Sequence, residues 1–179
     1  THCSAWSAPE AAATISDPTL DEISGIVVSR RQPGVLWVHE DSGAEPVLTA
    51  ISTSGQTLAT LTLSGASSID WEDLAIAPCG DTDCLWVGDF GDNSAIRDTV
   101  QLLRVEEPTL TEDAPALEAA VTVFPFQYPE GPRDAEALVV DGDGQPYVLT
   151  KRMDATTHLY RVPLEGMAQA TRITTISTG

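Results

Sequence analysis

Carboxylates gather in two short clusters that frame a pair of apolar runs near the middle of the chain. The first cluster precedes the run 74–77, and the second follows the run 85–87. Two antiparallel strands joined by a turn bring both clusters to the same end. So many repelling charges in one place favour a bound cation, or else form an exposed acidic rim. The carboxylates concerned are Asp70, Glu72, Asp73, Asp89 and Asp92.

Weaker copies of this arrangement occur on either side of it. A glutamate precedes an apolar run three times, and an aspartate follows the next run in the first two copies. If the strand after each glutamate runs away from it and the next strand runs back, these carboxylates share one face. Carboxylate oxygens, completed by backbone carbonyls and water, are the ligands that Ca²⁺ prefers. The predicted metal ligands are Glu22, Asp41, Glu72, Asp89, Asp92 and Glu136.

The same residues also have a structural explanation, which the sequence leaves open. Carboxylates at strand starts can accept backbone N–H bonds from a neighbouring unit of the fold. Asp89, Asp92 and Asn93 can instead form a turn stabilised by Asx hydrogen bonds. Their spacing lacks the terminal glutamate of an EF-hand loop.

Basic residues take the corresponding place in the third copy. Lys151 and Arg152 follow its second apolar run, where they either pair with the carboxylates or bind an anionic group of a substrate. His39 lies beside two carboxylates in the first copy and is a weaker candidate for a general base. No Gly-x-Ser-x-Gly nucleophile motif accompanies it.

The cysteines bear on the cellular compartment. Cys79 and Cys84 bracket a turn-like sequence, and a hairpin of this size brings two Cα atoms within disulfide reach. Zinc is not expected, because no histidine pair lies nearby. The expected disulfide indicates an oxidising compartment and hence a secreted, periplasmic or cell-surface protein. Cys3 then either pairs with a cysteine of a partner chain or of another segment, or remains a free thiol.

The chain is strongly acidic, with 9 Lys and Arg residues against 27 Asp and Glu residues and a net charge of −18. This charge repels nucleic acid and anionic lipid, so neither is an expected partner. No apolar run approaches the roughly 20 residues that cross a bilayer, and no membrane span is predicted. No signal peptide is visible, as expected of a mature form.

Short apolar runs with strand-like patterning fill most of the chain, and no long amphipathic helix is expected. An irregular arm over residues 1–19 leads into residues 20–179, where turns rich in Gly, Pro and Asp separate the runs. The runs form three groups, at about residues 22–64, 70–128 and 134–178. A Pro-rich, acidic excursion over residues 106–119 is expected on the surface. Repeated four-stranded meanders predict an all-β fold, namely a β-propeller of antiparallel blades with about three blades in this chain.

Three blades do not close a propeller, which usually has 4–8. An open array also leaves strand edges that invite pairing. We therefore expect an incomplete propeller whose remaining blades belong to the same polypeptide or to a second chain. Alternatively, two copies form a homodimer with six blades.

Several motifs resemble those of secreted bacterial β-propeller proteins, which are mostly uncharacterised. The motifs are Asp-Trp-Glu-Asp-Leu-Ala at 70–75, Leu-Trp-Val-Gly-Asp-Phe-Gly-Asp-Asn at 85–93, Asp-Ala-Glu-Ala-Leu at 134–138 and Thr-Lys-Arg at 150–152. These proteins are distantly similar to phytase-like and senescence-marker-like calcium propellers, and the resemblance covers roughly residues 20–165. It implies further blades beyond this sequence, and it implies that Glu22, Glu72 and Glu136 lie at the mouth of the central channel.

Two functions are expected from these patterns. The first is an extracytoplasmic calcium-binding β-propeller that acts as a binding or scaffold module. The second is a metal-dependent hydrolase of phosphoester, ester or lactone substrates, in which Ca²⁺ polarises the substrate oxygen and a bound water attacks. Phytate is a disfavoured substrate because the chain has few cations to meet it. An enzyme and a non-enzymatic binding module both fit these patterns.

Overall fold

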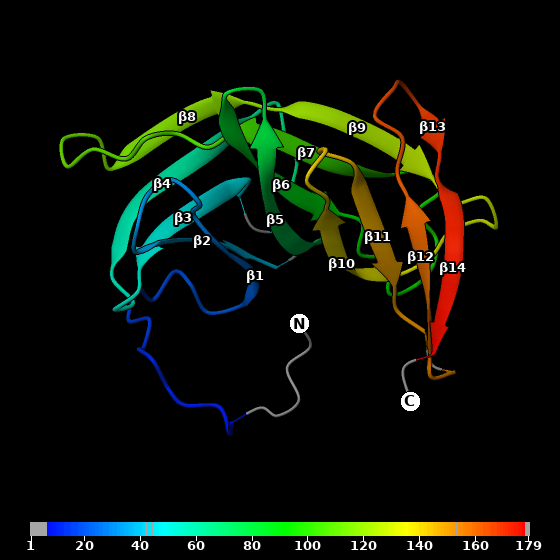
Figure 1. The fold of residues 1–179 in the computed structure, drawn as a ribbon, viewed down its shortest axis with the longest axis horizontal. Helices are drawn as coiled ribbons and strands as arrows, with labels where there is room; N and C mark the ends of the chain where they lie inside the picture. The colour runs from blue at the N-terminus through cyan, green and yellow to red at the C-terminus, as the bar shows by residue number, and fades with distance from the viewer. Residues whose placement is uncertain (1–6, 42, 44, 153, 178–179) are drawn as a thin grey trace.

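The computed structural model describes residues 7–41, 43, 45–152 and 154–177. In this part of the chain fourteen β-strands form three sheets and no helix occurs (Figure 1), so the predicted all-β class is confirmed. The strands are β1 (Ile23–Val28), β2 (Val35–Glu40), β3 (Val47–Ser52), β4 (Thr57–Ser64), β5 (Trp71–Cys79), β6 (Thr82–Asp89), β7 (Val100–Glu106), β8 (Ala116–Ala120), β9 (Thr122–Gln127), β10 (Ala135–Val140), β11 (Pro146–Thr150), β12 (Thr156–Arg161), β13 (Ala168–Gln169) and β14 (Thr171–Ser177).

Each sheet contains four strands joined in antiparallel succession. The first sheet has the order β1-β2-β3-β4-β8, the second β5-β6-β7-β9-β13 and the third β10-β11-β12-β14. Alternation along β4 shows why such segments become strands: Ala59, Leu61 and Leu63 are buried while the threonines between them are less so. A period of two places one set of side chains on the core face.

Two short strands cross from one sheet to the next. β8, which lies between β7 and β9 in sequence, pairs in parallel with β4 of the first sheet. β13, which lies between β12 and β14, pairs in parallel with β9 of the second sheet. The excursion over residues 106–119, predicted to lie on the surface, therefore leads into a strand that extends a neighbouring sheet.

The sheets stand side by side along an arc, with β1, β5 and β10 on its inner side (Figure 1). Apolar side chains fill the two spaces between them. Trp37, Trp71 and Leu85 belong to the cluster that joins the first and second sheets. Trp86 and Tyr160 belong to the cluster that joins the second and third. Because both clusters are buried, they fix how the inner strands lie against each other.

The β5–β6 hairpin carries the predicted cysteine pair. Cys79 and Cys84 lie at disulfide distance, with Cα atoms 5.7 Å apart, as the sequence predicts. They lie at the far end of this hairpin from Trp71 and Asp89, which pair at its open end. In the described part of the chain, no helix is long and apolar enough to cross a membrane.

An N-terminal arm precedes the first strand. Residues 7–14 are exposed and form no strand, in line with the irregular arm predicted there. The arm is attached near its end, where Thr57 donates a hydrogen bond of 2.6 Å from Oγ1 to Oδ2 of Asp17. Cys3 and His2 lie outside the described residues.

Candidate metal site at the start of the inner strands

The three inner strands begin at the same end of the molecule, and each has a bulge near its start. The register between first and second strands shifts at Ile23/Gly25, Trp71/Asp73 and Ala135/Ala137. A bulge adds an unpaired residue and redirects its side chain. The residues at the three bulges are Ser24, Glu72 and Glu136.

This register modifies the alignment on which the ligand prediction depends. Glu72 and Glu136 occupy equivalent positions, whereas Ser24 takes that position in the first sheet. Glu22 stands two residues earlier, is exposed, and corresponds to Asp70 and Asp134. The correspondence is visible in the backbone, because the carbonyls of Glu22, Asp70 and Asp134 each accept an N–H from one of the first two residues after the returning strand.

Carboxylates from neighbouring strands meet in two groups at this end. Asp41, Asp70 and Glu72 form the first group, and Glu72, Asp134 and Glu136 form the second. In each group one oxygen per residue lies within 4.8 Å of the others. Of the six predicted ligands, the structure thus brings together Asp41, Glu72 and Glu136, with Glu72 shared by both groups.

Glu72 is the most enclosed member of the two groups. It is 9% exposed, and no hydrogen bond reaches its carboxylate from the described residues. Burial raises the pKa of Glu72 to about 8, and the charges of Glu136, Asp70, Asp41 and Asp134 add to the shift. Burial and the nearby Asp41 also raise the pKa of Asp70, although Arg97 opposes this. A largely buried carboxylate among other carboxylates is stabilised by a proton or a bound cation.

Gly91 supplies the space in which the first group assembles. A Cβ atom on Gly91 would stand 2.5 Å from Oδ2 of Asp70, and closer still to Glu72. The backbone N–H of Gly91 donates to the carbonyl of Asp70 at 3.1 Å, which holds the two segments together. A residue with a side chain at this position would displace one or both carboxylates.

A lysine already occupies the second group. Lys151 Nζ lies 2.6 Å from Oε1 of Glu136 and 3.6 Å from Oδ2 of Asp134. These carboxylates, Glu136 foremost, raise the pKa of Lys151. Arg152, the other predicted substrate-binding residue, pairs with Asp154 instead. Glu72, which belongs to both groups, forms no such ion pair with the described residues, so a cation would be held around its carboxylate.

Asp89 and Asp92 lie outside both groups and support a loop. The fully buried carboxylate of Asp89 accepts hydrogen bonds from Arg97, from Gln101 and from the backbone of Asp70. The Asp92 carboxylate accepts the backbone N–H groups of Ile96 and Arg97, at 2.9 and 2.8 Å. Asp92 thus stabilises the loop that follows it, as the structural explanation proposed, but through N–H groups four and five residues on and not through the two-residue span of an Asx turn.

A surface hollow adjoins the second group. It has a volume of about 460 Å³, and the side chains that line it include Arg133, Asp134, Lys151 and Arg152. The lining also includes Asp92 and Asp154, so three basic side chains face three carboxylates there. Lys151 and Arg152 already pair with carboxylates, and an anionic group bound in the hollow would compete with these ion pairs.

The position of His39 does not support a role as a general base. The ring is fully buried, and its Nδ1 bonds to the carbonyl of Glu40 at 2.8 Å. Its Nε2 faces Gly25, where a Cβ atom would stand only 2.3 Å away. Burial lowers the pKa of His39. The side chain fills the joint between β1 and β5 and does not open to a hollow.

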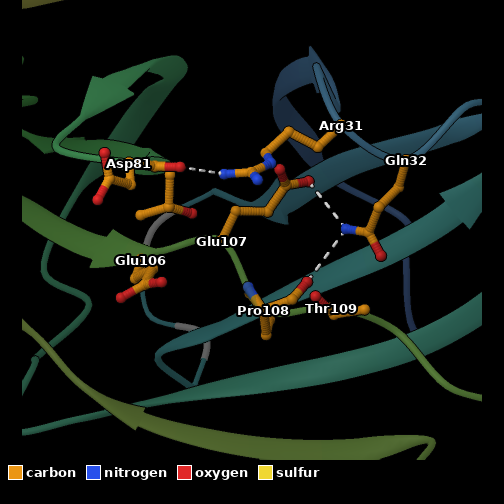
Figure 2. A pocket seen from close by; sticks show the side chains of 8 residues that line it. Arg31, Gln32, Asp81, Glu106, Glu107, Pro108 and Thr109 are labelled. Carbon is orange, nitrogen blue, oxygen red and sulfur yellow. Dashed lines mark hydrogen bonds between the residues drawn. The ribbon is translucent and has the colours of Figure 1, made fainter.

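A larger hollow of about 610 Å³ lies at the turn that carries Asp81, and Figure 2 shows its lining. Glu107, only 7% exposed, accepts hydrogen bonds from Trp37 Nε1 at 2.9 Å and Gln32 Nε2 at 3.2 Å. Arg31 donates to the carbonyl of Asp81 at 2.7 Å. These contacts tie the turns of the first two sheets together. Glu107 was not predicted from the sequence, because its role depends on contacts with residues distant in sequence.

Asp134 was not predicted from the sequence either, and Asp70 was not among the predicted ligands. Their signal was available, because both begin an Asp-x-Glu motif at the start of an inner strand. Residues two apart in a strand lie on the same face of it.

No protein-family model matches the chain, and no curated protein matches it either. The resemblance to secreted bacterial propellers therefore stays a prediction from the motifs. The geometry of the acidic groups carries the functional argument instead.

Proposed function

We propose that this protein is an extracytoplasmic calcium-binding module whose main ligands are Asp41, Asp70 and Glu72. The observation that carries the proposal is Glu72, a buried carboxylate without a hydrogen-bond donor among the described residues that faces two further carboxylates. With a pKa of about 8, Glu72 retains a proton at neutral pH in the calcium-free protein, and a divalent cation would replace that proton. Backbone carbonyls and waters would complete the coordination shell.

The donor set favours calcium over softer metals. Both groups consist of carboxylates alone, without histidine or cysteine. Zinc, copper and nickel sites normally recruit imidazole or thiolate ligands. Magnesium requires a near-ideal octahedron at short distances, whereas calcium accepts irregular shells of oxygen atoms. The proposed disulfide at Cys79 and Cys84 agrees with a compartment where calcium is abundant.

We further propose that the three sheets are blades of a β-propeller. Each sheet consists of an inner strand followed by three antiparallel neighbours, and the inner strands β1, β5 and β10 lie next to one another. Further blades, from another chain or from a longer polypeptide, would complete the ring. The acidic groups would then lie at the mouth of its channel, where a partner or ligand can reach the metal.

Calcium titration tests this proposal directly. We expect isothermal titration calorimetry to show calcium binding and thermal unfolding to show a higher Tm with calcium than with EDTA. Glu72→Gln should abolish both effects, whereas Glu165→Gln, at an exposed position, should leave both intact. An unchanged Tm in EDTA together with no calorimetric signal would reject the metal site.

A metal-dependent hydrolase is a second candidate, favoured by the hollow beside Asp134. Lys151, Arg152 and Arg133 could hold a phosphate or carboxylate group of a substrate there. The residues of the metal group would orient the reacting ester, and calcium would polarise its oxygen. Hydrolysis of model phosphoesters, esters or lactones that needs calcium and is lost in Glu72→Gln would support this function. Calcium binding without turnover would instead support the binding module as the function.

A further inference from the structure

The outer edge of the third sheet lacks a feature that the other two sheets share. In the first and second sheets the outermost antiparallel strand, β4 or β9, is covered by a parallel strand, β8 or β13. Each covering strand comes from the connection that precedes the last strand of the following sheet. The corresponding strand of the third sheet is β14.

β14 has no parallel neighbour in the described part of the chain, and all seven of its residues are exposed. Unpaired N–H and C=O groups along such an edge provide a template for another strand. The corresponding edges of the first and second sheets, β4 and β9, are each covered by a parallel strand. A strand that covers β14 should therefore also run parallel to it.

The N-terminal arm resembles the covering strand β8 in sequence. Residues 8–14 read A-P-E-A-A-A-T, and residues 114–122 around β8 read A-P-A-L-E-A-A-V-T. The arm is exposed over residues 7–14, and none of its backbone groups is hydrogen-bonded to the described residues. In the first sheet, β3 and β4 are joined by a short turn that offers no covering strand. The arm can take that role.

Within the strands, exposed large apolar side chains concentrate on the two end sheets. The first sheet exposes Ile26 at 57% and Val28 at 60%, and the third exposes Val139 and Ile173 at 51% each. In the strands of the middle sheet, the exposed large apolar residue is Val123, at 38%. The end sheets thus present the surfaces that the middle sheet buries against its two neighbours.

We propose that two copies of this chain associate about a two-fold axis, and that residues 8–14 of each copy add as a parallel strand to β14 of the other. The inference rests on the proposed blade arrangement of the sheets. A two-fold axis on the inner side of the arc brings the arm of one copy to the β14 side of the other, because the arm extends from the end of the arc opposite β14 (Figure 1). The first sheet of one copy then follows the third sheet of its partner.

Charge shapes the expected behaviour of the dimer. Each copy carries a net charge of −18, so the two copies repel each other at low ionic strength. Backbone hydrogen bonds and buried apolar side chains oppose this repulsion and are screened little by salt. Association should therefore strengthen as salt is raised from well below to above physiological ionic strength.

Sedimentation equilibrium across a range of concentrations tests the proposal, with Cys3→Ser protein so that a disulfide between copies cannot mimic association. We expect twice the 19.0 kDa chain mass at physiological and higher salt. The double variant Ala11→Pro with Ala12→Pro should weaken the dimer by about tenfold or more, because successive N–H groups of a strand point to opposite sides and one must face β14. The matched Ala11→Ser with Ala12→Ser variant should still dimerise.

Two results would overturn the inference. One is a monomer at every concentration and salt, and the other is a dimer that the proline variant leaves unchanged. Calcium titration of the same samples separates this inference from the proposed function. A monomer that binds calcium rejects the strand exchange alone, whereas a dimer without calcium binding rejects the metal site alone.

Discussion

Glu72 and Gly91 lie so close that a Cβ atom on Gly91 would stand 2.2 Å from Oε1 of Glu72. The glycine is buried, and it is needed here for space, since it lies outside the left-handed conformations found at several turns. A carboxylate that rests on a backbone in this way has little freedom. Its position depends on β6 and on the loop that follows it.

Gly91→Ala should therefore weaken calcium binding while the fold persists. The added methyl group forces the carboxylates of Glu72 and Asp70 apart, and we expect the calcium Kd to rise by about tenfold or more. Gly142→Ala is the matched control, because a Cβ atom there meets nothing within 4 Å. Calorimetry on both variants, with circular dichroism to check folding, measures the effect. Equal affinities in the two variants would argue against ligands at this position.

The pH dependence of stability should reflect the titration of the Glu72 carboxyl. Its pKa is about 8 in the folded calcium-free protein, against an ordinary value of 4.5. Between these values the folded state holds more protons than the unfolded state, so the free energy of unfolding falls as pH rises through this window. The calcium-free protein should lose several degrees of Tm between pH 5 and pH 8, since about 1 kcal/mol corresponds to roughly 2–4 °C for a chain of this size.

Calcium and substitution should both flatten this dependence. Bound calcium replaces the proton on Glu72, so binding near pH 7 should release protons and strengthen as pH rises. Glu72→Gln removes the titrating group, and its calcium-free Tm should change less between pH 5 and pH 8 than that of the unaltered protein. Calorimetry in buffers of different ionisation enthalpy measures the released protons. A calcium-free Tm that rises over this window would contradict the assignment.

Much of the strand pattern could be predicted from the sequence, because apolar runs and turn residues alternate clearly. The two strands that were not predicted, β8 and β13, pair in parallel with strands far away in sequence. β8 consists mainly of alanine, which has low strand propensity, so only the exposed edge of β4 makes it a strand. Such long-range pairing leaves no local signal.

The candidate site was predicted in part for a similar reason. The sequence identified Glu72 and Glu136 through their repeated position, but the equivalent bulge residue of the first inner strand is Ser24, and Glu22 lies two residues before it. Asp89 was predicted as a ligand from its place at a strand end. Its oxygens instead accept donors from Arg97 and Gln101. Which carboxylates have donors nearby depends on packing.

The ammonium group of Lys151 should prevent calcium from binding to the second acidic group. Replacing it by methionine removes the charge that pairs with Glu136 and Asp134. We expect Lys151→Met to lower the calcium-free Tm and to increase calcium affinity, or to add a second binding event. Arg152→Met is the control, because Arg152 pairs with the exposed Asp154. Titration calorimetry would reject this prediction if both variants bound calcium like the unaltered protein.

Substitutions of Asp92 test whether this residue is a calcium ligand or a support for the loop. Its two oxygens each accept a backbone N–H, from Ile96 and from Arg97. Asp92→Ala leaves these donors without their acceptor, and we expect a loss of about 1–3 kcal/mol of stability. Asp92→Asn retains one acceptor oxygen and should lose less. Both variants should bind one calcium ion per chain once it is saturating, because neither removes a member of the first group. A complete loss of calcium binding in folded Asp92→Asn would instead make Asp92 a ligand, as the sequence predicted.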